Sequence, residues 1–233
     1  MKNLLRISLF FNAFCLGCLL FALVKIGSPR YLLQLVKYRG NGIVSLKKSK
    51  TSHLNTLPIT QGKIIMLGNS ITAECEWAEL MQNPDIINRG VIADGTGDIL
   101  ERLDPIIAAK PKKVFLLIGV NDLMFLTLPQ IQDFYEKIVS RLVTETPTTQ
   151  LYLESILPIH TDLRRNGMKN EDIDTLNKAI EQIAKKHHAT FIDLNSKFKN
   201  TEGSLRTEFS LDGIHLNGEG YLLFKDILQP YFQ

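Results

Sequence analysis

Short apolar runs alternate with amphipathic segments over the last three quarters of the chain. Residues 63–67 and 114–118 are almost wholly apolar, as expected for strands that helices cover on both faces. Shorter runs predict strands around 86–87, at 151–156 and at 190–194. Helical spacing of apolar residues predicts helices at 74–82, 97–110, from Pro129 onward, at 171–187 and at 217–232.

Five strands that alternate with helices of these lengths indicate a parallel sheet with helices on both sides. The expected fold class is therefore α/β: a three-layer, doubly wound, flavodoxin-like fold with a five-stranded parallel sheet. In such sheets, sites form at the carboxyl ends of the strands.

A different pattern occupies the N-terminus. Residues 7–24 carry no charge, and Lys2 and Arg6 precede them. This length is close to the roughly 20 residues that span a bilayer as a helix, although a secretory signal also has this form. We expect residues 1–26 to be a transmembrane anchor or signal segment, and we favour the uncleaved anchor.

The orientation of this segment has two readings. The C-terminal flank is the more basic one, which by the positive-inside rule places the adjoining domain in the cytoplasm. Short basic leaders, in contrast, usually send the domain behind them across the membrane. We favour a membrane-anchored or exported protein whose domain lies on the periplasmic or extracellular side.

Between this segment and the domain, residues 27–61 read as a basic juxtamembrane linker, and a domain is expected at 62–233. The net charge is only +3, and much of the positive charge falls in residues 25–50. A nucleic-acid-binding surface is therefore not expected. The three cysteines provide neither a disulfide framework nor zinc-ligand spacing.

Polar residues of chemical interest come after several of the predicted strands. Ser70 follows the first strand, Gly90 the second and Asn121 the third, whereas Asp212 and His215 follow the fifth. Because the carboxyl ends of parallel strands share one edge of a sheet, these residues are expected to converge.

Together these residues form a possible acyl-transfer site. A serine hydroxyl becomes a good nucleophile when a histidine takes its proton, and a carboxylate can orient that histidine. We assign these catalytic roles to Ser70, His215 and Asp212. An oxyanion hole needs hydrogen-bond donors, for which the Ser70 N–H, the Gly90 N–H and the Asn121 amide are candidates.

Each signal also has an ordinary structural explanation. Asn69-Ser70 alone is a common helix cap, and Asp212-Gly213 is a common turn. His160, which follows the fourth strand, is a weak candidate for substrate binding, and loop polarity explains it otherwise. The catalytic interpretation rests on the coincidence of four weak signals at strand ends.

In the segments around these residues, the sequence resembles the SGNH (GDSL-type) hydrolases. The similar blocks are IIMLGNSIT, INRGVIADG, LIGVNDL and LDGIHLNGEGY, and the resemblance covers roughly residues 62–232. It implies a serine esterase with a Ser-His-Asp triad and an acyl-enzyme, and neither a metal nor another cofactor. Asn69 departs from the family, which more often has aspartate there.

The expected function is hydrolysis of short-chain acyl esters, first of all O-acetyl esters on carbohydrate. Three alternatives stay open: acyl transfer to a sugar hydroxyl, a lysophospholipase-like esterase and a catalytically silent glycan-binding module. The expected partners are a small-molecule or glycan ester and, through the N-terminal segment, a membrane.

Overall fold

The computed structural model describes residues 29–163 and 168–232, with the backbone alone for 29–41. The chain divides into two compact units, 1–46 and 47–233. The predicted membrane segment, residues 1–26, lies outside the described residues. Within residues 29–163 and 168–232, no helix combines the length and apolar character that a membrane span requires.

Helix α2 (Pro29–Thr56) occupies most of the segment that the sequence predicts as a linker. Pro29 is its first residue, where proline lacks no helical hydrogen bond, and Pro58 follows its end. No proline interrupts the sequence between them. The basic and polar segment is therefore helical over Pro29–Thr56.

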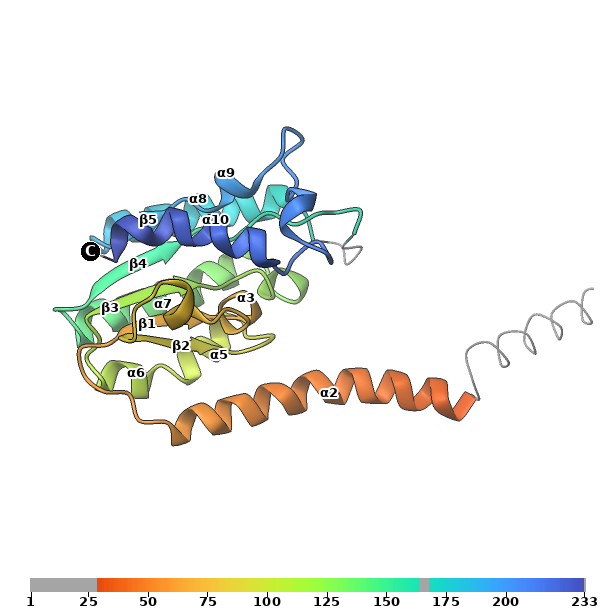
Figure 1. Cartoon of the computed structure of the whole chain (residues 1–233), viewed down its shortest axis with the longest axis horizontal. Helices are drawn as coiled ribbons and strands as arrows, with labels where there is room; N and C mark the ends of the chain where they lie inside the picture. The colour runs from red at the N-terminus through yellow and green to blue at the C-terminus, as the bar shows by residue number, and fades with distance from the viewer. Residues whose placement is uncertain (1–28, 164–167, 233) are drawn as a thin grey trace, which may run out of the picture. The chain divides into compact units, whose positions relative to one another are not determined.

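A five-stranded parallel sheet lies at the centre of the 47–233 unit (Figure 1). Its strands are β1 (Ile64–Gly68), β2 (Ile86–Gly90), β3 (Lys113–Leu117), β4 (Gln150–Glu154) and β5 (Thr190–Ile192). Their order is β2-β1-β3-β4-β5, and every pairing is parallel. The predicted five-stranded parallel sheet is confirmed, and the order is that of flavodoxin-like folds.

Helices cover both faces of the sheet, and β1 shows how its residues divide between them. Ile65 and Leu67 pack on one face, whereas Ile64 and Met66 pack on the other. The first face carries α5 (Thr96–Glu101), α6 (Asp104–Ala108), α7 (Leu128–Glu145) and α8 (Asn170–Lys186). The second carries α3 (Ser70–Ala73), α4 (Trp77–Leu80), α9 (Asn195–Phe198) and α10 (Gly218–Leu228). The described chain also contains three short 3-10 helices, η1 (Asp122–Met124), η2 (Thr207–Phe209) and η3 (Gln229–Tyr231).

The helix predicted at 97–110 is broken into α5 and α6, and the helix predicted at 74–82 is shorter in the structure, where α4 covers 77–80 and the separate α3 precedes it. Pro105 lies in the first turn of α6, where it starts a new helix instead of continuing α5. After α3, the Asn88 side chain donates hydrogen bonds to the carbonyls of Thr72 and Cys75 at 2.9 and 3.0 Å. These carbonyls are thus satisfied outside a helix, so α3 ends early and α4 begins separately.

The strand register brings the predicted site segments to one edge. Gly68 at the end of β1 is level with Gly90 on β2 and Leu117 on β3. A Cβ at Gly68 would lie 2.4 Å from the Leu117 carbonyl and 2.2 Å from Thr72 Oγ1. Glycine is therefore required by close packing, which lets α3 sit directly above the end of β1.

Candidate active site

Ser70, His215 and Asp212 form a hydrogen-bonded chain at this edge. His215 Nε2 lies 2.9 Å from Ser70 Oγ, and His215 Nδ1 lies 2.7 Å from Asp212 Oδ2. Ser70 is separated from His215 by 145 positions in sequence, so the fold creates the contact. The arrangement has the geometry of a nucleophile, a base and an orienting carboxylate.

The loop that carries Asp212 and His215 is held by its own polar groups. Asp212 Oδ1 accepts the backbone N–H groups of Ile214 at 3.0 Å and His215 at 2.8 Å. Ser210 Oγ accepts the N–H of Gly213 at 2.9 Å, and Gly213 has a φ of +84° that favours glycine. The short sequence therefore fixes the imidazole relative to the carboxylate.

These hydrogen bonds also set the charge of Asp212. Partial burial acts to raise its pKa, but the hydrogen bonds from His215 and Ile214 outweigh burial and lower the pKa to about 2. The ionised carboxylate favours the tautomer with a proton on Nδ1 of His215. Nε2 is then free to accept the Ser70 proton.

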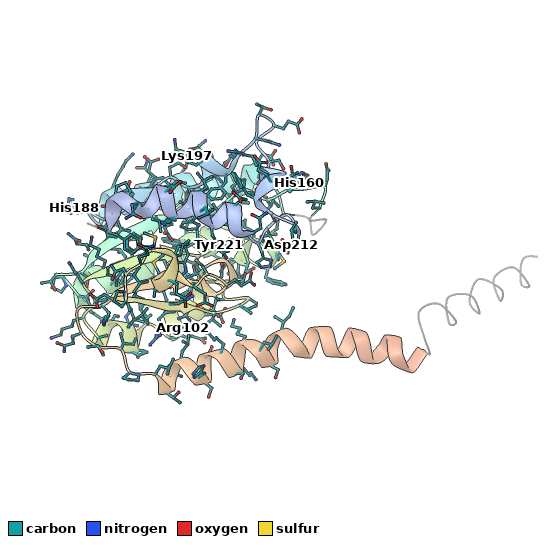
Figure 2. All side chains as sticks on the ribbon, in the orientation of Figure 1. Arg102, His160, His188, Lys197, Asp212 and Tyr221 are labelled. Carbon is teal, nitrogen blue, oxygen red and sulfur yellow. The ribbon has the colours of Figure 1, made fainter. Side chains whose placement is uncertain are left out.

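Ser70 itself begins helix α3. The preceding Asn69 caps the helix, because its side-chain oxygen accepts the Ile71 N–H at 3.0 Å. From α10, Tyr221 donates its hydroxyl to the Ile71 carbonyl at 2.8 Å (Figure 2). The asparagine that replaces the family's usual aspartate thus keeps the capping interaction without the charge.

On the other side of Ser70, Asn121 follows β3. Its Nδ2 donates one hydrogen bond to the Asp94 carbonyl at 2.9 Å, and an amide nitrogen carries two hydrogens. The next residue, Asp122, is buried. Its carboxylate accepts hydrogen bonds from the Thr96 backbone N–H at 2.9 Å and from the Thr96 hydroxyl at 2.6 Å. The loops after β2 and β3 are therefore tied together beside the serine.

The Gly90 amide is placed differently from the expectation. It donates to Asn88 Oδ1 at 2.8 Å and is therefore already paired. A Cβ at Gly90 would lie 2.3 Å from the Ala73 nitrogen. The glycine at the end of β2 lets α3 approach closely, and the geometry does not support its predicted oxyanion role.

The backbone just beyond Gly90 offers another donor, which the sequence does not predict. Ala93 has a φ of +62°, which is uncommon for alanine. The N–H groups of Val91 and Asp94 are paired with backbone carbonyls, but among the described residues that of Ala93 has no acceptor. Ala93 and Asn121 line one cavity of about 370 Å³. The sequence gives no hint of this donor, because alanine rarely adopts a positive φ and an alanine at this position therefore does not indicate such a conformation.

A charge network supports the same loop from behind. Arg102 Nε lies 2.7 Å from the buried carboxylate of Asp94, and its Nη2 donates to the Gly68 carbonyl at 3.2 Å. From α2, Lys47 Nζ lies 2.5 Å from Asp98 and 3.4 Å from Asp94. Burial raises the pKa of Asp94, and the neighbouring Arg102 and Lys47 oppose that rise.

His160 lies next to the loop that bears the histidine of the site. The backbone N–H of His160 donates to the Gly213 carbonyl at 2.9 Å. Figure 2 labels both His160 and Asp212. Among the described residues, its buried Nδ1 has no hydrogen-bond partner. The side chain borders a polar cavity of about 240 Å³ that Asp162, Lys169 and Glu202 also line.

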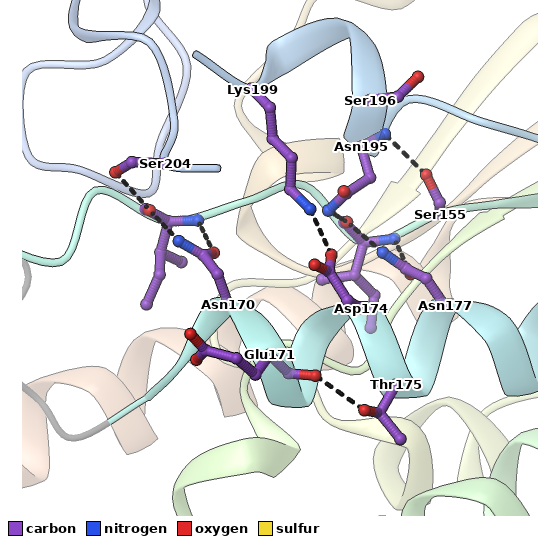
Figure 3. A network of polar contacts seen from close by, with 12 residues as sticks. Ser155, Asn170, Glu171, Asp174, Thr175, Asn177, Asn195, Ser196, Lys199 and Ser204 are labelled. Atoms are coloured by element: carbon purple, nitrogen blue, oxygen red, sulfur yellow. Dashed lines mark hydrogen bonds and ion pairs between the residues drawn. The ribbon is translucent and has the colours of Figure 1, made fainter. Parts of the chain in front are cut away.

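Two asparagines of α8 hold the segment that leads to His160 (Figure 3). Asn177 accepts the N–H of Ile156 at 2.7 Å and donates to its carbonyl at 2.9 Å. Asn170 makes the same pair of bonds to Ile159, each at 2.9 Å. Each asparagine amide therefore makes the two backbone hydrogen bonds that a neighbouring strand would make, and it makes them to a segment beyond the end of β4.

Two further observations concern other possible chemistry. Within residues 29–163 and 168–232, no group of three histidine, cysteine or acidic side chains is arranged to hold a metal ion. Cys75 is buried, and burial raises the pKa of its thiol to about 12. Cys75 is thus a packing residue, because thiolates are the reactive form.

Comparisons with known proteins agree with this geometry. Human platelet-activating factor acetylhydrolase IB subunit alpha1 is 26% identical over 68% of this chain and 70% of its own length. Acetylxylan esterase from Geobacillus stearothermophilus is 23% identical over 59% of this chain and 67% of its own. A solved Streptococcus pneumoniae structure, described as a putative platelet activating factor, is 26% identical with a TM-score of 0.77, covering 86% of this chain and 99% of that one.

The family model for GDSL-like lipases and acylhydrolases matches residues 66–223, which contain the Ser70 turn, the Asn121 loop and the Asp212–His215 loop. With that match, the chain belongs to the GDSL-like lipase/acylhydrolase family and is a carboxylic ester hydrolase.

Proposed function

We propose that this hydrolase cleaves short-chain acyl esters, in the first place O-acetyl esters on carbohydrate, through an acyl-enzyme. The main support is the chain of hydrogen bonds from Ser70 to His215 to Asp212. Ser70 Oγ attacks the ester carbonyl carbon while its proton passes to His215 Nε2. The ester C–O bond then breaks, and His215 returns the proton to the departing alcohol.

Hydrolysis of the acyl-enzyme completes the cycle. Water attacks the same carbonyl carbon, again with His215 as the base, and the acid leaves as Ser70 regains its proton. In both steps the carbonyl oxygen becomes negatively charged. The donors in this proposal are the N–H of Ser70, the free amide hydrogen of Asn121 and the N–H of Ala93 in place of Gly90.

Two observations favour a small acyl group and a polar alcohol. The polar cavity beside His160 has room for a hydroxylated group near the loop of His215. The similarity to an acetylxylan esterase agrees with an acetyl group on a sugar.

We test the reaction with the full chain in detergent micelles. The wild-type protein should release p-nitrophenol from p-nitrophenyl acetate, and Ser70→Ala should lower kcat/KM by at least about 10³-fold. Ser196→Ala, an exposed serine on α9, is the matched control and should match the wild type. Full activity in Ser70→Ala would refute the assignment. Product analysis with and without glycan acceptors separates hydrolysis from transfer.

The N-terminal segment completes the proposal. The uncharged run 7–24 would tether the hydrolase to a membrane, with the domain on the exported side. An alkaline wash should leave the full chain in the membrane pellet, whereas replacement of Leu16, Leu19 and Leu20 by lysine should release it. A C-terminal reporter that is active only in the cytoplasm would overturn the orientation.

A further inference from the structure

The last turns of α2, the edge strand β2 and helix α6 line a small cavity of about 20 Å³. Its polar lining consists of Arg89 on β2, Arg102 directly after α5, and Thr51 and Asn55 on α2. Apolar side chains complete the wall. All of these residues belong to the 47–233 unit, and none takes part in the proposed reaction. The polar lining of this cavity therefore needs an explanation of its own.

Arg89 is the unusual member of the lining. The residue is only 5% exposed. Its Nη1 donates to the Asn88 carbonyl at 3.1 Å, and its Nη2 donates a long hydrogen bond to the Leu57 carbonyl at 3.5 Å. Among the described residues, the buried Nε has no hydrogen-bond acceptor, and no carboxylate forms an ion pair with this guanidinium.

The nearby carboxylates are already paired with other cations. Asp94 lies 2.7 Å from Arg102 Nε and 3.4 Å from Lys47 Nζ, and Lys47 Nζ lies 2.5 Å from Asp98. Figure 2 labels Arg102. Arg102 thus has its counter-charge, whereas Arg89 has only backbone carbonyls. The cavity wall therefore carries one positive charge that no described side chain neutralises.

An unpaired charge in this position is unfavourable. Burial and the neighbouring charge of Arg102 both lower the pKa of Arg89, but a guanidinium stays protonated at neutral pH. Burying a charge costs much free energy unless the charge has a partner. A mobile anion from the solvent is the remaining kind of partner.

We propose that this cavity binds a single chloride ion, which neutralises Arg89. The cavity has room for one small occupant, so phosphate and sulfate are too large. A water molecule also fits, but it brings no negative charge. The Thr51 hydroxyl and the Asn55 amide are further donors suited to an anion, and Asn55 is exposed, which gives the ion a route from solvent.

The place of the ion in the fold gives it a stabilising role that does not depend on the proposed esterase reaction. Arg89 directly precedes Gly90, and Arg102 holds both the Asp94 carboxylate and the Gly68 carbonyl. A chloride ion beside the two arginines would offset their mutual repulsion. It would thereby fasten the end of α2 to β2 and support the loop at 90–96.

The first experiment measures thermal unfolding of the full chain in nonionic detergent micelles. Circular dichroism gives Tm in sodium chloride and in sodium methanesulfonate at equal ionic strength. A ligand that binds only the folded state raises Tm, and methanesulfonate is too large for the cavity. The wild-type Tm should therefore be higher in chloride by at least about 3 °C. Equal Tm values in the two salts would overturn the proposal.

Two variants locate the effect. Arg89→Met removes the charge at similar volume, so its Tm should differ by less than about 1 °C between the salts. Arg141→Met is the matched control, because Arg141 on α7 is already paired with Glu145 and Asp104. It should keep the wild-type difference. A chloride response that persists in Arg89→Met would contradict the assignment.

A second measurement needs no variant, so it decides the question even if Arg89→Met does not fold. Bromide has the charge of chloride and is only slightly larger, and it scatters anomalously. Wild-type crystals grown in sodium bromide should show an anomalous peak beside the Arg89 guanidinium. Ordinary density at that place without an anomalous signal would identify a water molecule and would refute the chloride site.

Discussion

The two loops beside Ser70 achieve their positions in different ways. The loop at 210–215 contributes side chains to the site, and a few hydrogen bonds within the loop hold both Asp212 and His215 in position. The loop at 90–96 places backbone groups, and its conformation depends on Asn88, Asp122 and Arg102 from other elements. A site made of side chains can thus be read from a short motif, whereas a site made of backbone amides depends on its neighbours.

The largest expected effect comes from breaking the side-chain loop. Asp212→Asn should keep the fold but lower kcat by about 10³–10⁴-fold, because the amide no longer favours the required tautomer of His215. Steady-state kinetics with p-nitrophenyl acetate measure the loss, and circular dichroism checks the fold. A variant with near wild-type kcat would show that the carboxylate does not orient the imidazole.

A smaller effect is expected on the other loop. Asn121→Ala removes one oxyanion donor and should lower kcat by about 10²–10³-fold with little change in KM. Since Asn121 also bonds the Asp94 carbonyl, Asn121→Asp serves as a comparison of similar size that lacks the donor. If Asn121→Asp retains full kcat, the donor role is excluded.

Gly90 tests whether packing and catalysis are separate at the end of β2. A methyl group would overlap Ala73, so Gly90→Ala should lower the free energy of unfolding by about 1–3 kcal/mol. The molecules that stay folded should keep their kcat. Urea denaturation combined with active-site titration measures both quantities, and a normal stability with lost kcat would return the oxyanion role to Gly90.

A substitution at Ala93 is expected to change the free energy of unfolding in the opposite direction. Its positive φ is strained for alanine, so Ala93→Gly should raise the free energy of unfolding by about 0.5–1 kcal/mol. The N–H is retained, and kcat should therefore change less than about threefold. A large loss of kcat would mean that the alanine methyl group, rather than the amide, matters at this position.

The smallest effect is a pH dependence of the side-chain loop. The folded pKa of Asp212, about 2, is below the value of about 3.9 for an unfolded aspartate. Its stabilising contribution is therefore present above about pH 4 and lost as the pH falls toward about 2. Solvent screening keeps the contribution small because the side chain is 43% exposed. Urea unfolding at about pH 6 and about pH 2.5 should show the wild type and Asp212→Asn converging in acid.

The sequence predicts the sheet well because the central strands β1 and β3 are almost wholly apolar and shorter apolar runs mark the other three strands. It predicts Ser70, Asp212 and His215 because serine, aspartate and histidine are the residue types that a nucleophile, an orienting carboxylate and a base require. For the oxyanion donor after β2 it offers Gly90, whose N–H is paired with Asn88, whereas nothing in the sequence points to the Ala93 N–H that we propose instead. It also misses the length of α2, where basic and polar residues hide a helix that two prolines delimit.

The paired bonds from Asn170 to Ile159 have a consequence for how this enzyme can change. They clamp the two ends of the segment 160–169 together, and His160 is fixed in turn to Gly213. Closing a loop of different length between fixed ends costs little extra free energy. Insertions and deletions within 161–168 should therefore alter what reaches the mouth of the site without disturbing the triad.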